Sequence, residues 1–222
     1  MKLDLHVHTR FSQDGISSTD WIAEIIKRRR LDGLAITDHN TTRGWKSMKE
    51  AARKFGLELI LGEEIKIYRN GIFSGEILGL FLNELIRPGT PGEVADQIRQ
   101  QDGIAVISHP FHRLKGFRDL EKFAGKMDAL ETFNSRILSK ATNERAFKFA
   151  LRKGLGMTGG SDAHAPWEVG LAYTIADASD MEEFRKALKR RETRFSGRMN
   201  PPLMHLLSIG ALSFRKLCNL SV

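Results

Sequence analysis

The chain has 222 residues, a formal net charge of +8 and a single cysteine, Cys218. This length suffices for one sizeable domain with a buried core, and no long linker rich in proline, serine or glycine divides it. No apolar run is long enough for a membrane span, and the start MKLDLHVHT lacks the apolar stretch of a signal peptide. One cysteine excludes an intramolecular disulfide, so we expect a cytoplasmic protein in a reducing compartment.

Strand-like and helical patterns alternate along the chain. Apolar and polar residues alternate over residues 3–8, which is the period of a β-strand and places His6 and His8 on one side. Further strands are predicted over residues 33–37, 57–62, 104–110, 127–134 and 155–160. Helices are predicted over residues 17–33, 42–56, 90–103, 140–154 and 180–192. The pair Asn70-Gly71 between two β-like runs predicts a tight hairpin.

The repeated order of strand and helix indicates an α/β fold with a parallel sheet. The number of units favours a closed or nearly closed barrel over an open doubly wound sheet. We expect one domain over residues 1–222, with the barrel in residues 1–198 and a loop with a packing helix in residues 199–222.

The positive charge favours an anionic partner. Part of it lies in Arg28 to Arg30 and in the run FRKALKRRETRFSGR, where Lys189 and Arg190 suit the carboxyl end of a helix. A nucleic-acid patch is the alternative interpretation, but no stacking aromatics are interleaved with these charges. Nucleic acid is therefore a possible partner but not the favoured one.

Histidines and acids follow the predicted strands, at the point where each strand ends. They are His6 and His8, Asp38 and His39, Glu63 and Glu64, His109, and Asp162 and His164. Because the carboxyl ends of barrel strands open on one face, we expect these side chains to converge on one mouth. A core histidine or a capping aspartate would explain any one position, but not the whole pattern.

Imidazole and carboxylate ligands without cysteine suit zinc, manganese or iron, with magnesium less favoured. More than four ligands imply more than one ion, so we expect two to three divalent metal ions. Neighbouring cations need a shared carboxylate, for which Glu64 is the natural candidate. Such a cluster acidifies water and holds both oxygens of a phosphoryl displacement, so hydrolysis is the leading chemistry.

The motifs HVHTRFSQDG, ITDHNT, GEEI, ISHP and GGSDAH, in that order, resemble the PHP (polymerase and histidinol phosphatase) family from residue 3 to about residue 175. This resemblance implies a distorted seven-stranded β/α barrel of the PHP type, with a two- or three-metal site that hydrolyses phosphate esters. It assigns His6, His8 and Asp162 to a first metal, with Glu64 as the bridge to a second, which His109 completes. It assigns Asp14, His39 and His164 to a third metal. Glu64 and Asp162 are the expected catalytic carboxylates, and Glu63 is an outer neighbour.

Glu76 stands where similar chains often have a histidine, and it is a further candidate ligand. A tight two-residue turn would put Glu76 and Glu64 on opposite faces of the hairpin unless a bulge intervenes. A glutamate there would favour manganese or magnesium over zinc. Glu131 matches a family acid, and we expect it to anchor a ligating imidazole by a hydrogen bond rather than to bind metal directly.

Arg43, Arg113 and Arg136 are candidates for binding the phosphate, because guanidinium pairs with it bidentately. Each has the alternative of an ordinary solvated loop charge. His112 is a candidate proton donor for the leaving oxygen, with a surface role as the alternative.

The sequence therefore predicts a metal-dependent phosphoric ester hydrolase. It would hydrolyse a small phosphomonoester or nucleotide through a metal-activated hydroxide. An exonuclease acting on oligonucleotides is one alternative, and a non-catalytic metal-binding module is another. An amidohydrolase is disfavoured because no lysine stands at a strand end among the acids, Lys66 being the nearest. We predict no membrane association, and the sequence does not indicate an oligomeric state.

Overall fold

One curved sheet runs through the computed structural model, which describes residues 1–217 and the side chains of residues 1–214. The strands are β1 (Lys2–Val7), β2 (Gly33–Ile36), β3 (Glu58–Arg69), β4 (Ile72–Leu80), β5 (Ile104–Ile107), β6 (Ala129–Asn134), β7 (Gly156–Gly160), β8 (Ala172–Ile175) and β9 (Arg194–Gly197). Their order in the sheet is β7-β6-β5-β4-β3-β2-β1-β8-β9. Strands β1 to β7 therefore follow one another in chain order, as in a β/α barrel.

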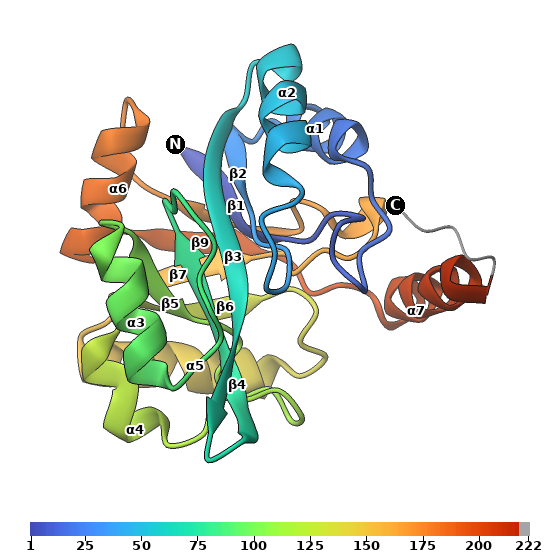
Figure 1. Cartoon of the computed structure of the whole chain (residues 1–222). Helices are drawn as coiled ribbons and strands as arrows, with labels where there is room; N and C mark the ends of the chain where they lie inside the picture. The colour runs from blue at the N-terminus through green and yellow to red at the C-terminus, as the bar shows by residue number, and fades with distance from the viewer. Residues whose placement is uncertain (218–222) are drawn as a thin grey trace.

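The sheet closes almost completely between β1 and the segment that follows β7 (Figure 1). The backbone N–H of Asp162 donates to the His6 carbonyl at 2.8 Å, and the N–H of His8 donates to the Ala163 carbonyl at 2.9 Å. Beyond this seam, β8 pairs antiparallel with the first residues of β1, and β9 pairs antiparallel with β8. The predicted nearly closed barrel is thus confirmed, although β8 and β9 were not predicted.

Strand β4 interrupts the expected parallel sheet. It is antiparallel to β3 and to β5, whereas the pairs β1–β2, β2–β3, β5–β6 and β6–β7 are parallel. The cause is the predicted hairpin, in which Asn70 and Gly71 have φ angles of 49° and 73°. Two such residues reverse the chain at once, whereas a parallel crossover needs a dozen or more residues.

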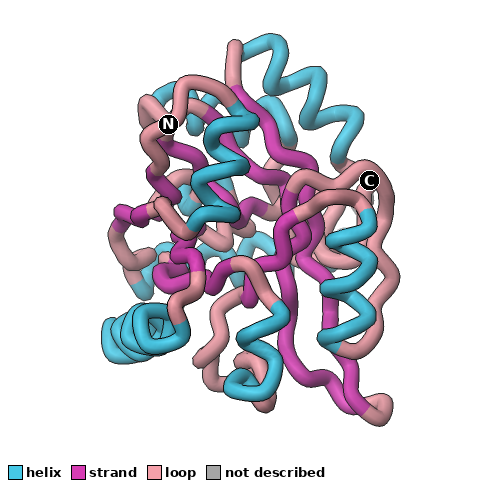
Figure 2. Tube along the Cα trace, turned by 90° about the vertical axis from the view of Figure 1, so that its left-hand side faces the viewer, coloured by secondary structure: helices cyan, strands magenta, loops and turns pink. Residues whose placement is uncertain are grey.

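The helices lie around the strands (Figure 2). They are α1 (Thr19–Arg28), α2 (Trp45–Phe55), α3 (Pro91–Gln100), α4 (Leu120–Phe123), α5 (Lys140–Lys153), α6 (Met181–Arg190) and α7 (Pro202–Leu217), with short 3-10 turns at Ala124–Lys126 and Pro166–Glu168. Ser18, Thr90 and Asp180 cap α1, α3 and α6 through their side chains. Helix α1 ends before the predicted Gly33, because Arg30 is left-handed and Leu31 turns into the core.

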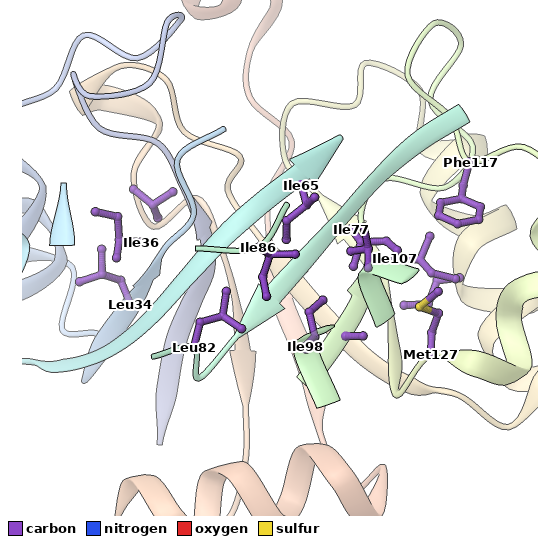
Figure 3. Close-up of a cluster of buried hydrophobic side chains, with 14 of the residues drawn as sticks. Leu34, Ile36, Ile65, Ile77, Leu82, Ile86, Ile98, Ile107, Phe117 and Met127 are labelled. Atoms are coloured by element: carbon purple, nitrogen blue, oxygen red, sulfur yellow. The ribbon is translucent and has the colours of Figure 1, made fainter. Parts of the chain in front are cut away.

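Aliphatic side chains fill the space between the sheet and the helices. Figure 3 shows Ile65, Ile77 and Ile107, from three adjacent strands, near Ile86 and Ile98. Each of these side chains is completely buried. Burying one such side chain contributes about 1.5–3 kcal/mol, so this cluster fixes the strands whose ends carry the polar residues.

Helix α7 occupies the predicted C-terminal helical segment and extends to one side of the molecule (Figure 1). Leu203, Leu206 and Phe214 on this helix are each more than 60% exposed. Within residues 1–217, no helix combines the length and apolar character needed to cross a membrane. Cys218 lies outside the described residues.

Candidate metal centre

The nine side chains that the sequence predicts as metal ligands meet at one end of the barrel. They are His6, His8, Asp14, His39, Glu64, Glu76, His109, Asp162 and His164, and contacts of 3.0–3.6 Å between nitrogen and oxygen atoms connect them. Three overlapping groups of these side chains could each hold a metal ion. The side chains of Asp14 and Asp162 are 27% and 14% exposed, so these two face the opening of the site.

The first group consists of His6, His8 and Glu64, and Asp162 lies beside it. The Nε2 atoms of His6 and His8 are 3.1 Å apart, and they lie 3.3 and 3.4 Å from Glu64 Oε2. Asp162 Oδ1 lies 3.5 Å from His6 Nε2 and 3.3 Å from His8 Nε2. Ligand atoms around a tetrahedral zinc ion are about 3.4 Å apart, as follows from bonds of about 2.0–2.1 Å. The spacings among His6, His8 and Glu64 fit a single divalent cation.

Glu64 Oε2 provides an independent test of that fit. It is buried and has no hydrogen-bond partner among the described residues. Yet the ring nitrogens of His6, His8 and His39 lie 3.3, 3.4 and 3.1 Å away. A buried carboxylate oxygen without a hydrogen bond is costly. Its position among imidazole nitrogens is the one that a shared cation ligand would take.

The second group consists of His39, Glu64 and Glu76, and His109 lies beside it. His109 Nε2 lies 3.0 Å from Glu64 Oε1 and 3.4 Å from Glu76 Oε2. His39 Nδ1 lies 3.6 Å from Glu76 Oε1. The backbone of His109 has a φ of 24°, a strained value of the kind that concentrates at functional sites.

A β-bulge brings Glu76 into this second group. Beyond the hairpin, Tyr68 pairs with Phe73 but Ile67 pairs with Gly75, so the register shifts by one residue at Ser74. Without the shift, Glu76 would point to the opposite face from Glu64. Gly75 permits the bulge, because its φ is 128° and a Cβ atom there would lie 2.8 Å from the Cα atom of Phe117.

The third group consists of His8, Asp14, His39 and His164. Asp14 Oδ2 lies 3.2 Å from His39 Nε2 and 3.1 Å from His164 Nε2. His39 therefore faces the second group with Nδ1 and the third with Nε2, whereas the resemblance assigns it to the third metal alone. His164 Nδ1 contacts the carbonyl of Asp162 at 2.8 Å, which leaves Nε2 directed at Asp14.

Glu131 lies behind the first and second groups, where its carboxylate fixes their orientation. Its Oε1 lies 2.9 Å from His6 Nδ1, so the other ring nitrogen of His6 faces the centre. Its Oε2 accepts the backbone N–H of His109 at 2.8 Å and the side-chain amide of Asn134 at 3.0 Å. A carboxylate behind a ligating imidazole sets the tautomer and the ring orientation, and this role of Glu131 toward a metal stays a prediction.

Burial and neighbouring charges favour the cation-binding forms of His8, Glu64 and Asp162, whereas the pKa values of His6, His39 and His109 are raised. Burial lowers the pKa of His8 to about 3, so its imidazole is neutral. Burial alone would raise the pKa of Glu64 and of Asp162, but the neighbouring imidazoles hold both pKa values well below the usual range. Burial alone would lower the pKa of His6, but Glu64 and Glu131 raise it well above 6.5. A cation entering this site would displace that proton.

A cavity of about 560 Å³ opens beside Asp14, His109, Asp162 and His164. Of the three arginines predicted to bind phosphate, Arg113 and Arg136 line it. Arg136 also donates through one terminal nitrogen to both oxygens of the buried Glu168, at 2.9 Å each. Arg43 does not line this cavity; it donates to the carbonyl of Phe11 at 3.1 Å.

Lys115 is a cation at the cavity that the sequence analysis missed. Burial alone would lower its pKa, but Glu64 and Glu76 raise it. The signal available was the basic pair in HRLKG after β5, which is common in ordinary loops. His112 lines the same cavity; burial lowers its pKa to about 4, and its Nδ1 accepts the backbone N–H groups of Leu114 and Lys115.

Sequence profiles identify the family. The profile described as "PHP domain" matches residues 4–153, and the profile described as "PHP-associated" matches residues 140–193. An uncharacterized protein of Methanocaldococcus jannaschii is 34% identical over 181 residues, which cover 78% of this chain and 69% of that protein. The phosphoribosyl 1,2-cyclic phosphate 1,2-diphosphodiesterase of Eggerthella lenta is 34% identical over 65 residues, which cover 29% of this chain and 24% of that enzyme.

Solved structures share the fold. A two-domain Bacteroides vulgatus protein containing a predicted PHP-like metal-dependent phosphoesterase has a TM-score of 0.71 and 22% identity, covering 89% of this chain and 65% of that one. A lesion-specific endonuclease of Pyrococcus furiosus has a TM-score of 0.64 and 20% identity, covering 85% of this chain and 56% of that one.

Proposed function

The chain belongs to the PHP domain family, and on that premise we propose that it is a metal-dependent phosphoesterase that hydrolyses a small phosphomonoester or nucleotide. The observation that carries the proposal is the first ligand group, whose spacing suits one divalent cation, at the edge of a cavity with basic walls. A phosphomonoester carries two negative charges near neutral pH, so it suits such a mouth better than a neutral substrate does.

Two to three divalent ions of zinc, manganese, iron or magnesium are the proposed cofactors. When bound, they supply a Lewis acid for the phosphoryl oxygens and acidify a water molecule. Glu64, which belongs to both the first and the second group, offsets the repulsion between neighbouring cations. Asp162, partly exposed at the cavity, is the second proposed catalytic carboxylate.

The basic side chains of the cavity are the proposed phosphate-binding groups. Arg113 and Lys115 line it and form no ion pair within the described residues, and Arg136 is held in place by Glu168. Guanidinium and ammonium groups there stabilise the charge on the transferring phosphoryl group. We exclude Arg43 from this role because it lies outside the cavity lining.

A phosphodiesterase acting on nucleic acid is the second candidate. The net charge of +8 favours it, as does the fold shared with an endonuclease of Pyrococcus furiosus. The cavity favours the monoester, because its lining in the described chain includes no Phe, Tyr or Trp on which a base could stack.

The cytoplasmic location stays a prediction.

A competition assay tests the proposal. A nucleoside monophosphate, an aryl phosphate and single-stranded RNA of mixed sequence are supplied at equal concentration with manganese, and in parallel with a chelator. We expect metal-dependent release of inorganic phosphate from at least one monoester, at a higher kcat/KM than RNA degradation. Faster degradation of RNA would replace the phosphatase by a nuclease, and inactivity toward all three would favour a non-catalytic module.

A further inference from the structure

Helix α7 supplies one wall of the cavity beside the candidate metal centre. His205, Ser208, Ile209 and Leu212 line it, at spacings that place them on one face of the helix. The two family profiles end at residues 153 and 193, so this wall lies outside the matched segments. The family profiles therefore do not describe this wall.

A buried hydrogen-bond network fixes α7 against the site. Ser208 Oγ donates to Glu168 Oε1 at 2.8 Å, and the indole N–H of Trp167 donates to Ser208 Oγ at 3.1 Å. Glu168 is completely buried, and its Oε2 accepts the backbone N–H of His164 at 2.8 Å. The same carboxylate binds Arg136, so one residue ties together the helix, a basic wall residue and a predicted metal ligand.

The cavity wall away from the ligands is largely apolar. Leu114, Leu138 and Ile209 are 82%, 61% and 48% exposed, and all three line the cavity together with Ile137 and Leu212. Apolar side chains that are exposed to solvent around one cavity can contact and bury an apolar group of a ligand.

Few groups in this wall could recognise a sugar or a base. Apart from the predicted ligands, the described lining residues include no carboxylate, and the amide of Asn134 already donates to Glu131 and Asp162. The remaining uncharged polar groups are the hydroxyls of Ser139, Thr142 and Ser208 and the imidazoles of His112 and His205. Of these, Ser208 is bonded to Glu168, and His112 Nδ1 already accepts two backbone N–H groups. A polar alcohol part would exchange its hydration for these few partners, at a cost wherever one of its groups stays unpaired.

We propose that the substrate is a phosphomonoester whose alcohol part is apolar, with its hydrocarbon against Ile209 and Leu212 of α7 and its phosphate at the candidate metal centre. This inference rests on the proposed function and narrows it: the substrate is an alkyl or simple aryl phosphate rather than a sugar phosphate or a nucleotide. Arg113 and Lys115 lie at the cavity to meet the phosphate.

A series of primary alkyl phosphates, from ethyl to octyl, tests this proposal on the full-length chain with manganese. Their leaving alcohols have nearly the same acidity, so differences in kcat/KM report binding of the chain rather than chemistry. We expect kcat/KM to rise about fourfold for each methylene that becomes buried, until the cavity is filled. The kcat/KM for glycerol phosphate should be close to the values for the shortest alkyl esters.

Two variants and a matched control locate the effect. Ile209→Ser and Leu212→Ser should each flatten the dependence on chain length. Leu206→Ser removes an apolar side chain that is 65% exposed on the same helix but does not line the cavity, so it should keep the full dependence. Circular dichroism of each variant checks that α7 and the barrel remain folded.

Calorimetric binding of alkylphosphonates of the same lengths separates this inference from the proposed function. Affinity that rises with chain length supports the apolar subsite even if no ester is hydrolysed, in which case only the hydrolase proposal fails. Equal affinity for ethyl- and octylphosphonate overturns the subsite, whatever the enzyme hydrolyses. A chain-length effect that the Leu206→Ser variant loses as strongly as the Ile209→Ser variant overturns it as well.

Discussion

Glu63 and Glu64 are adjacent in sequence and have opposite surroundings. Glu64 faces four imidazoles, whereas Glu63 accepts one hydrogen bond, from the backbone N–H of Ile86 at 3.0 Å. Burial raises the pKa of Glu63 to about 7, so this carboxyl group is largely protonated below neutral pH. Successive side chains of β3 point to opposite faces of the sheet, so Glu63 and Glu64 lie on different faces. Only Glu64 offers a charged carboxylate to cations.

Glu64→Gln should therefore remove at least one metal ion per chain and lower kcat/KM by on the order of 100-fold or more, because it deletes the charge shared by two groups. Glu63→Gln keeps the shape of a protonated carboxyl group and should keep the metal content. Elemental analysis and a phosphate-release assay on both variants give the comparison. Equal losses in the two variants would mean that the bridging glutamate is wrongly assigned.

The candidate ligands could be predicted from the sequence because strand-end positions are set by local alternation and by a common barrel mouth. The basic residues could not be ranked in the same way. Arg136 meets Glu168, which lies 32 positions away, and Arg43 turns to the carbonyl of Phe11. Such pairings depend on how loops fold over one another, and nothing in the local sequence of either arginine specifies its partner.

At the scale of elements, the hairpin could be predicted but its bulge could not. Asn70-Gly71 is a strong turn signal, whereas the only trace of the bulge is Gly75, one of the 20 glycines in the chain. Strands β8 and β9 are four residues each and pair with segments distant in sequence, so they lacked a local pattern long enough to predict. The five helices predicted within residues 17–192 are present, with ends that differ by up to five residues, whereas the short helix α4 was not predicted.

Gly75→Ala should displace Glu76. Gly75 has a positive φ, at which a residue with a Cβ atom lowers the free energy of unfolding by about 1–3 kcal/mol. The added Cβ atom would also contact Phe117. We expect a loss of stability in denaturant unfolding and at least a tenfold loss of kcat/KM.

Gly71→Ala is the matched control for that variant. Its φ is also positive, but an added Cβ would meet nothing within 4 Å. It should cost about 1–2 kcal/mol of stability and leave the metal content unchanged. If the two variants bind the same number of ions with the same activity, Glu76 has no part in the site.

At the scale of the whole molecule, the three ligand groups predict a metal content of two to three ions per chain. They share His8, His39 and Glu64, so occupancy of one group affects the next. Elemental analysis after reloading with manganese or zinc should find this range. Chelation should lower the free energy of unfolding, by about 3 kcal/mol for a site previously held at 100 times its dissociation constant. Fewer than one ion per chain after reloading would contradict the prediction.

A cation at the first group would also connect the two sides of the barrel seam, where β1 meets the segment after β7. There, the backbone N–H of Ser161 donates to Asp4, 157 positions earlier in the chain. Bringing such distant segments together costs about 4–5 kcal/mol of chain entropy. A cation held by both His6 and Asp162 would join the two sides as a reversible cross-link, much as a disulfide closes a long loop. During synthesis, Asp162 is added only after almost three quarters of the chain, so this link to His6 cannot form earlier. We therefore expect the metal centre to be completed late in folding.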